Sequence, residues 1–301
     1  MMASVNKVIV RLKGGLGNQL FCYCAARSLS LKNNAELVID DVSGFQRDTK
    51  YRRRYTLMHF SIPARMATPA DRLEPFERYR RGLAKWRSRR LPFEQRAYLE
   101  QEFRDFDPRL LALRLEGDLY LDGLWQSEIY FTDIEEVIRQ DLTIKPPTDR
   151  ANQNMAARIA ECANAVALHV RWFEAPVATE SSRNVSGGYY QRVIAYVQAH
   201  VEQPHFFLFS DDPAAAALRI LLPEGCYTVV SHNMSDELAY ADLWLMSQCR
   251  HFITANSTFS WWGAWLGEKV GSLVIAPDPD SLDPGNSWCA KGLLPSRWTK
   301  L

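Results

Sequence analysis

Short apolar runs alternate with segments of helical periodicity along most of the chain. The pattern opens with an apolar strand at residues 8–10 and a glycine-rich turn at 14–17. A helix is predicted over 18–31, followed by a buried strand at 36–40. A strand, a crossover helix and a second strand in this order are typical of a βαβ unit.

The alternation continues and is most regular in the second half of the chain. Further strands are predicted at residues 119–121, 165–170, 206–209, 227–230, 251–254 and 273–276. Helices are predicted near 128–140, over 189–199, from 213 onward, and over 236–247 and 259–266. Because these strands are apolar throughout, both faces of their sheet must be covered, as in parallel sheets flanked by helices. We therefore expect an α/β fold of two Rossmann-like, doubly wound parallel-sheet domains facing a cleft.

The best candidate for a link between the two domains is the segment 144–149, IKPPTD. Adjacent prolines exclude both a helix interior and a central strand. We therefore expect an N-terminal domain at residues 1–146 and a C-terminal domain at residues 147–301.

Composition adds one feature that the hydrophobic pattern does not show. The 301 residues are 47% hydrophobic and 24% charged, which excludes a disordered or collagen-like chain. The net charge of +1 conceals an asymmetry, because residues 47–96 hold 15 Lys or Arg against 5 Asp or Glu. That stretch carries +10 and the remainder −9, so the neutrality is a cancellation.

Within this basic stretch a helix is predicted over residues 69–90, as an insertion in the N-terminal domain. One side of it carries the apolar residues Leu73, Phe76, Tyr79, Leu83 and Trp86, and basic residues fill much of the rest. Two interpretations stay open. The helix is either a solvated cover of the N-terminal domain or a basic amphipathic helix on an anionic membrane surface.

The sequence also bears on the compartment. No segment reaches the roughly 18 consecutive apolar residues that a membrane-spanning helix needs. The N-terminus enters an apolar strand without a signal-peptide pattern, and the six cysteines fit neither zinc nor disulfide spacing. We expect a cytoplasmic protein with no nucleic-acid partner, for which a peripheral contact with the inner face of the plasma membrane is the alternative.

Candidate chemistry is expected beyond the carboxyl ends of the strands, where open α/β sheets bind ligands. The first such place is the glycine turn, with Gly15, Gly17 and Asn18 at the start of a helix. Its backbone amides suit an anion, although a purely structural turn is the other interpretation. A dinucleotide fingerprint would require glycine where Leu20 stands, which argues against an NAD-type oxidoreductase.

The second place is the end of the strand at 165–170. His169 and Arg171 are two residues apart and so share a face of an extended segment. The guanidinium of Arg171 suits bidentate contact with phosphate and stays charged at any working pH. A histidine that is merely a satisfied polar residue is the competing interpretation for His169.

Two more strand ends carry small polar side chains. Asn256, Ser257 and Thr258 stand where a strand gives way to a helix, a suitable cradle for phosphate oxygens. The acidic pair at 211–212 could bind a metal, hold a hydroxyl or cap the next helix, and capping is the default. The tryptophans at 261–265 have helical spacing and are predicted to pack in the core.

Several of these segments together resemble a known family, the α-1,2-fucosyltransferases of glycosyltransferase family 11, of bacterial surface-polysaccharide type. The resemblance is carried by GGLGNQLF at 14–21, GLWQSEIYF at 123–131 and FSDD at 209–212. It continues in DLWLMS at 242–247 and in the tryptophan-rich block at 255–266. It implies a GT-B fold and an inverting α-1,2-fucosyltransferase. The reaction would move L-fucose from GDP-L-fucose to the 2-hydroxyl of a terminal galactoside in an O-antigen-like surface glycan, with a lipid-linked acceptor as one option.

The resemblance also implies roles for individual residues. Arg171, with the amides around Ser257 and Thr258, would hold the diphosphate, and Asp242 with His169 would hold guanine. Arg171 and His169 are also expected among the catalytic residues. Glu174 is the candidate catalytic base and Glu180 the reserve. No metal or other cofactor is expected.

One departure from the family pattern stands next to Arg171. Where members typically have H-x-R-R-G-D, this chain has HVRWFE, so Trp172 replaces the second arginine and Phe173 the glycine. We expect the bulkier loop to narrow or reshape the acceptor pocket. Two alternatives therefore stay open, namely the same fold acting on another GDP-6-deoxysugar and a non-catalytic GDP-sugar or glycan-binding module.

Overall fold

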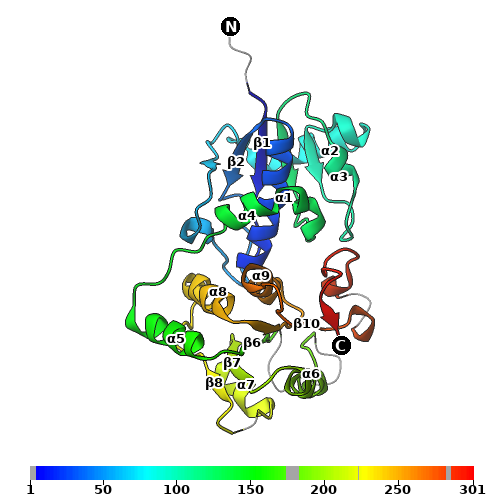
Figure 1. Ribbon diagram of the computed structural model, residues 1–301. Coiled ribbons are helices and arrows are strands. Elements are labelled where there is room, and N and C mark those ends of the chain that lie inside the picture. The colour runs from blue at the N-terminus through cyan, green and yellow to red at the C-terminus, as the bar shows by residue number, and fades with distance from the viewer. Residues whose placement is uncertain (1–4, 174–182, 223, 283–285) are drawn as a thin grey trace. The chain divides into compact units, whose positions relative to one another are not determined.

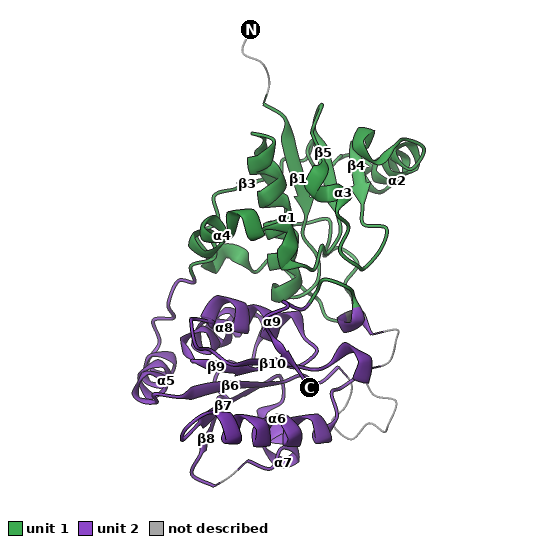
Figure 2. Ribbon diagram, turned by 45° about the vertical axis from the view of Figure 1, so that its right-hand side comes forward, with its two compact units in different colours: residues 1–143, 290–293 green, residues 144–289, 294–301 purple. Residues whose placement is uncertain are grey.

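The chain forms two compact units in a computed structural model that describes residues 5–173, 183–222, 224–282 and 286–301. Unit 1 comprises Met1–Thr143 and Ala290–Leu293, and unit 2 comprises Ile144–Cys289 and Leu294–Leu301 (Figure 2). The chain thus leaves unit 1 at Thr143, whereas the sequence pattern placed the boundary at 146. A C-terminal segment also returns to unit 1, because Ser127 Oγ donates to the carbonyl of Gly292 at 2.6 Å.

Unit 1 is built on a five-stranded parallel sheet. Its strands are β1 (Lys7–Arg11), β2 (Glu36–Asp40), β3 (Arg65–Met66), β4 (Tyr98–Glu100) and β5 (Leu119–Asp122), in the order β3-β2-β1-β5-β4. Its α-helices are α1 (Leu16–Lys32), α2 (Glu77–Ser88), α3 (Arg109–Ala112) and α4 (Glu135–Asp141) (Figure 1). The strand order reverses between β1 and β5, so their carboxyl ends define a switch point in this unit.

Unit 2 has a six-stranded parallel sheet in the order β11-β10-β9-β6-β7-β8. The strands are β6 (Ala165–Val170), β7 (His205–Ser210), β8 (Tyr227–Val229), β9 (His251–Ile253), β10 (Val274–Ala276) and β11 (Thr299–Lys300). The helices are α5 (Arg150–Glu161), α6 (Gly187–His200), α7 (Pro213–Arg219), α8 (Ala239–Gln248) and α9 (Thr258–Gly267). Counted in chain order, the strands have the 3-2-1-4-5-6 arrangement of dinucleotide-binding sheets. Figure 2 shows α8 and α9 over one face and α6 and α7 over the other, which confirms two helix-flanked parallel sheets.

The elements that the sequence pattern missed are short or begin abruptly. β3 and β11 have two residues each, too few for a periodicity to be recognised. β4 (YLE) ends in a glutamate and lies among charged residues, so it lacks the apolar run that marks the equally short β10. α5 follows the proline pair directly, and Asp149 caps it by accepting the N–H of Asn152 at 2.9 Å. None of the described helices combines the length and apolar character needed to cross a bilayer.

The predicted helix over 69–90 is wrong in its first part, because α2 begins at Glu77. Asp71 closes a turn by accepting the N–H and the hydroxyl of Thr68. Leu73 and Phe76 then have positive φ values of 64° and 63°, which no right-handed helix accommodates. The helix expected near 128–140 is likewise shorter, since short 3₁₀ turns precede α4.

The tryptophans of α9 confirm the expectation that they pack in the core. Trp261 and Trp262 are fully buried and Trp265 nearly so. The ring centroids of Trp261 and Trp298 lie 5.4 Å apart. This core fixes the N-terminus of α9 relative to the sheet, and with it the polar loop that precedes the helix.

Candidate functional site

Two loops leave the unit 2 sheet where its strand order reverses. β6 and β9 are neighbours, with Leu168 opposite Ile253. The chain continues from β6 to β7 on one side and from β9 to β10 on the other. Ligands of open α/β sheets bind at such a switch point. The end of β6 with the loop at 171–173, and the loop at 254–257 with the start of α9, lie there. The structure therefore brings together the predicted residues His169, Arg171, Asn256, Ser257 and Thr258.

The guanidinium of Arg171 is held by a carboxylate from the neighbouring strand. Arg171 Nη1 lies 2.9 Å from Asp211 Oδ2, and Asp211 Oδ1 accepts the N–H of Trp172 at 3.0 Å. Asp212 caps α7 by accepting the N–H of Ala215 at 3.0 Å. The two acidic residues therefore have different roles. The predicted helix cap is confirmed for Asp212, whereas Asp211 positions Arg171 at the edge of the sheet.

His169 is a neutral group in the interior. It is 4% exposed, and its ring centroid lies 5.4 Å from that of Phe259. Burial, and then the positive charge of Arg171, lower its pKa to about 3. At neutral pH the ring is therefore uncharged and too weak a base to accept a proton from a hydroxyl. Any contact of His169 with a ligand has to be made by a neutral imidazole.

The start of α9 offers unused polar atoms. Ser257 is the N-cap residue and accepts the N–H of Phe259 at 3.3 Å. His169 Nδ1, Thr254 Oγ1 and Asn256 Oδ1 are buried without a hydrogen-bond partner among the described residues. Buried polar atoms are nearly always paired, so three orphans at one sheet edge indicate a place for a polar ligand. The positive end of the α9 dipole favours an anionic one.

Arg183 belongs to this site, although the sequence pattern did not single it out. Its carbonyl accepts from Asn256 Nδ2 at 2.9 Å, and its Cζ lies 5.7 Å from the centroid of the Phe173 ring. Arg171 Cζ lies 5.4 Å from the same centroid. Two guanidinium groups therefore approach one aromatic ring at the switch point. Glu174 and Glu180, the candidate bases, lie outside the described residues.

Trp172 points into the core of unit 2, whereas the expectation that its loop narrows or reshapes the acceptor pocket stays a prediction. Trp172 is 8% exposed and belongs to the main hydrophobic cluster of unit 2, which also contains Tyr190. The guanidinium carbon of Arg219 lies 5.1 Å from the Trp172 ring centroid. A large apolar ring is more stable in the core than in a water-filled pocket, so it turns inward and leaves Phe173 beside Arg171.

Asp242 lies in the first turn of α8, which packs against α9. Its Oδ1 accepts from Asn233 Nδ2 at 2.8 Å, and Asn233 Oδ1 accepts from Asn152 Nδ2 at 3.0 Å. Burial raises the pKa of Asp242 to about 7, against the lowering effect of the Asn233 hydrogen bond. Only the ionised carboxylate accepts hydrogen bonds at both oxygens, so a ligand that donates to Asp242 would favour its ionised form and lower its pKa.

In unit 1 the glycine turn brings Gly15, Gly17 and Asn18 together at the start of α1. Gly15 is the N-cap residue, and a Cβ added to it would lie 3.3 Å from an Arg53 nitrogen. Asn18 Oδ1 accepts from Gln126 Nε2 at 2.8 Å, which links the first turn of α1 to the loop after β5. Helix amides beside a guanidinium suit an anion, as the sequence pattern indicated.

A buried Gln19 holds this turn in shape. Its Nε2 donates to the carbonyls of Gly14 and Arg54 at 3.0 and 2.8 Å, and its Oε1 accepts the N–H of Thr56 at 3.0 Å. Every polar atom of the side chain is thus used for backbone contacts. The glutamine of the GGLGNQ segment therefore has a structural role.

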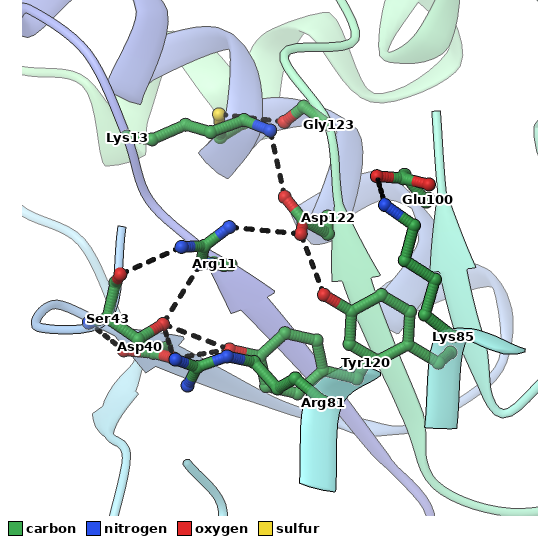
Figure 3. A network of polar contacts seen from close by, with 12 residues as sticks. Arg11, Lys13, Asp40, Ser43, Arg81, Lys85, Glu100, Tyr120, Asp122 and Gly123 are labelled. Atoms are coloured by element: carbon green, nitrogen blue, oxygen red, sulfur yellow. Dashed lines mark hydrogen bonds and ion pairs between the residues drawn. The ribbon is translucent and has the colours of Figure 1, made fainter. Parts of the chain in front are cut away.

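A paired polar network supports the same sheet edge (Figure 3). Asp122, at the end of β5, accepts from Arg11 Nη1 at 3.1 Å, from Lys13 Nζ at 2.8 Å and from the Tyr98 hydroxyl at 2.7 Å. Burial alone would raise the pKa of Asp122, but the charges of Lys13 and Arg11 outweigh it and lower the pKa. Residues from three strands and the β1–α1 loop are thereby locked together, a role that no local sequence pattern reveals.

The family model described as glycosyl transferase family 11 matches residues 7–283. The chain is 27% identical to an α-1,2-colitosyltransferase of Escherichia coli over 98% of both chains. It is 30% identical to the O-antigen biosynthesis glycosyltransferase WbnK of Escherichia coli, over 88% of this chain and 92% of the relative.

Among solved structures, the fold resembles that of a point mutant of Arabidopsis thaliana FUT1 in complex with GDP, with a TM-score of 0.56. The match covers 95% of this chain and 72% of the other at 13% identity, so it shows the fold alone. The family model, in contrast, runs from β1 past β10 and includes both switch points. The chain therefore belongs to glycosyl transferase family 11.

Proposed function

We propose that this glycosyltransferase is an inverting α-1,2-fucosyltransferase that moves L-fucose from GDP-L-fucose to the 2-hydroxyl of a terminal galactoside in an O-antigen-like surface glycan. Membership in the family and similarity to an O-antigen biosynthesis glycosyltransferase support the reaction class. The observation that carries the donor assignment is the guanidinium of Arg171, fixed by Asp211 at 2.9 Å beside the N-terminus of α9.

In this proposal the acceptor hydroxyl oxygen attacks C1 of fucose from the face opposite the β-phosphate. The new C1–O bond forms as the bond from C1 to the phosphate oxygen breaks, and GDP leaves with the bonding electrons. The hydroxyl proton passes to a carboxylate, for which Glu174 is the first candidate and Glu180 the second. Negative charge grows on the leaving diphosphate, where Arg171 and the amides at Ser257 and Thr258 would stabilise it.

Asp242 is the proposed partner of guanine. An ionised carboxylate can accept hydrogen bonds from both the N1–H and the N2–H groups of the base. Asp242 lies at the start of α8, and α8 packs against α9. The neutral ring of His169 is the second proposed contact, and its unpaired Nδ1 supports that role.

The donor sugar has a competing identity, because one relative at 27% identity is a colitosyltransferase. Colitose is fucose without the 3-hydroxyl, so the two donors differ by one polar group. A site that hydrogen-bonds a hydroxyl rejects an analogue lacking it by about 10⁴–10⁵-fold, whereas an apolar site hardly discriminates. A non-catalytic GDP-sugar or glycan-binding module is the other alternative.

A donor and acceptor panel tests these possibilities. Purified protein is incubated with GDP-L-fucose or GDP-L-colitose and galactose-terminated disaccharides, and GDP release and product linkage are measured. An α-1,2-fucosyl product supports the proposal. If the protein prefers GDP-L-colitose, the donor is GDP-L-colitose and not GDP-L-fucose. If it binds GDP but turns over none of the acceptors, the non-catalytic binding module is favoured.

The proposal also covers the architecture, the compartment and the metal requirement. The overall architecture is of the GT-B type, with the acceptor side in the N-terminal unit and the donor side in the C-terminal unit. The protein acts in the cytoplasm, and the reaction needs no metal ion. Turnover should therefore be the same in EDTA as in magnesium, and a loss in EDTA that added metal restores would contradict the last point.

A further inference from the structure

Helix α2 packs on unit 1 through its polar side. Arg81 and Ser88 are buried, and Ser88 Oγ accepts the N–H of Tyr98 in β4 at 3.1 Å. Ala84 packs against the small hydrophobic cluster over the sheet. The face of α2 that a soluble domain normally fills with large apolar residues therefore holds an arginine, a serine and an alanine.

The large apolar residues of this segment point away from the unit. Phe76 is 77% exposed, Tyr79 75% and Trp86 55%. Tyr79, the half-buried Leu83 and Trp86 follow at spacings of four and three and form one stripe along the helix, with Phe76 just before its first turn. They line a shallow groove beside Gly82. This stripe, which we call the outward face of α2, has no covering element among the described residues.

The surroundings of the outward face are strongly basic. Residues 76–90 contain seven Arg or Lys and one acidic residue, Glu77. Lys85 and Arg89 pair with Glu100, whereas Arg78, Arg87 and Arg90 are exposed. The guanidinium carbon of Arg90 lies 3.3 Å from the Trp86 ring centroid, which places a cation over an exposed aromatic ring.

From this arrangement we infer that the outward face of α2 docks on an anionic lipid surface. The helix lies along the surface, the three aromatic side chains enter the headgroup region, and the flanking arginines contact lipid phosphates. Tyrosine and tryptophan suit such a boundary because one end of each ring is apolar and the other polar. The contact would hold the enzyme where a lipid-linked glycan is presented.

Charge complementarity favours lipid over a second copy of this chain. A symmetric dimer through the outward face would bring two segments of net charge +6 together, and like charges facing each other cost free energy. An anionic bilayer instead offers an extended surface of opposite sign. Each arginine near such a surface strengthens binding about fivefold at moderate ionic strength.

Vesicle flotation of the full chain tests the inference. We expect it to float with vesicles of equal parts phosphatidylcholine and phosphatidylglycerol, to be released by high salt, and not to float with phosphatidylcholine alone. The double variant Arg78→Ala/Arg87→Ala should weaken partitioning about 25-fold, at about fivefold per arginine. The variant Phe76→Ser/Tyr79→Ser/Trp86→Ser should also lose binding.

Matched controls come from exposed residues of unit 2. Arg150→Ala/Arg192→Ala removes two exposed arginines, and Leu218→Ser/Leu221→Ser removes two side chains that are 86% and 76% exposed. Both should float like the parent, and every variant should retain transfer to a soluble acceptor. Absence of salt-sensitive flotation by the parent would overturn the inference. So would a dimer, detected by light scattering, that the triple serine variant abolishes.

Discussion

Asp211 holds Arg171 and the backbone next to it with the same carboxylate: Oδ2 lies 2.9 Å from Arg171 Nη1, and Oδ1 accepts the N–H of Trp172 at 3.0 Å. The guanidinium is therefore positioned before any ligand arrives. Preorganised charge of this kind stabilises a developing negative charge without reorganisation during the reaction.

Arg171→Ala should lower kcat about 10²–10³-fold and weaken GDP binding, because a fixed cation at the diphosphate is lost. Asp211→Asn should have a smaller effect, since an amide oxygen can still accept the N–H of Trp172 but no longer pairs with the guanidinium. Steady-state GDP release and calorimetric titration with GDP measure both. Asp212→Asn is the matched control, because asparagine caps α7 as well as aspartate does. Wild-type kinetics in Arg171→Ala would remove this residue from the site.

Arg183→Ala should weaken GDP binding about 10–100-fold, the range for losing a hydrogen bond to a charged group. We expect this because the guanidinium of Arg183 lies beside Phe173, and because the Arg183 carbonyl accepts a hydrogen bond from Asn256 Nδ2 at 2.9 Å. The loss should be large for GDP and small for guanosine, because only the diphosphate is concerned. Arg183→Lys should restore part of it, and Arg192→Ala serves as an exposed control. Equal losses for GDP and guanosine would show a structural role instead.

GDP affinity should rise with pH across neutrality, because burial raises the pKa of Asp242 to about 7 and only its ionised form accepts from guanine. The ionised fraction falls about tenfold from pH 8 to pH 6, and apparent affinity should fall by the same factor. His232 and Asp149 belong to the same polar cluster; burial lowers the pKa of His232, and hydrogen bonds from Asn152 lower the pKa of Asp149.

Calorimetry at several pH values measures this dependence. Asp242→Asn should bind GDP weakly and lose the part of the pH dependence that Asp242 causes; guanosine, which has no phosphate that titrates near pH 6, should then bind with a flat profile. Inosine diphosphate, which lacks the 2-amino group, should lose less affinity than GDP does on this substitution. A wild-type profile that stays flat between pH 6 and 8 would contradict the assignment of guanine to Asp242.

The sequence predicted the two sheets because a buried parallel strand is apolar throughout, and β2 and β6 were predicted to the residue. β3 and β11 were missed because two residues carry no periodicity, and β4 because its three residues lie among charged ones and form no apolar run. The late start of α2 depends on the turn at Thr68 and Asp71, which is a matter of specific hydrogen bonds.

The residues of the candidate site likewise fall into those that the sequence predicts and those that only the structure shows. The strand-end rule located Arg171 and Asn256, since it needs only the position of a strand. It also located Asp211, but not the ion pair of Asp211 with Arg171, and it could not identify Arg183, because these roles depend on contacts between β6, β7 and the loop before α6. Nor could it foresee the burial of Trp172, since the direction of a loop side chain is decided by the core into which it packs.

That burial predicts the outcome of restoring the family pattern at Trp172. Trp172→Arg should not supply a second phosphate contact. It should instead place a guanidinium in the hydrophobic cluster of unit 2, close to Arg219. We expect a lower midpoint of thermal unfolding and no gain in GDP affinity. Trp172→Ala should destabilise by about 3–5 kcal/mol through the cavity it leaves. Phe173→Gly, at the half-buried neighbour, is the comparison, and stable Trp172→Arg with tighter GDP binding would contradict the prediction.

The Asp122 network predicts a pH-dependent stability of unit 1. The charges of Lys13 and Arg11 lower the pKa of Asp122 below its ordinary value of 3.8, against burial. Its contribution is therefore fully present above the unfolded-state pKa and is lost as pH falls through the lower, folded-state pKa. Asp122→Asn removes the carboxylate that pairs with both cations, which typically costs about 3 kcal/mol at neutral pH.

Chemical denaturation of the parent and of Asp122→Asn at pH 7 and below pH 4 checks this prediction. The difference in unfolding free energy should be largest at pH 7 and should shrink in acid, where the parent's carboxylate begins to protonate. Asp133→Asn, at an exposed carboxylate of the same unit, should show no such difference at either pH. If the gap between parent and Asp122→Asn grew on acidification, the network of Figure 3 would owe its strength to hydrogen bonds of a protonated Asp122, and the lowered pKa of Asp122 would be refuted.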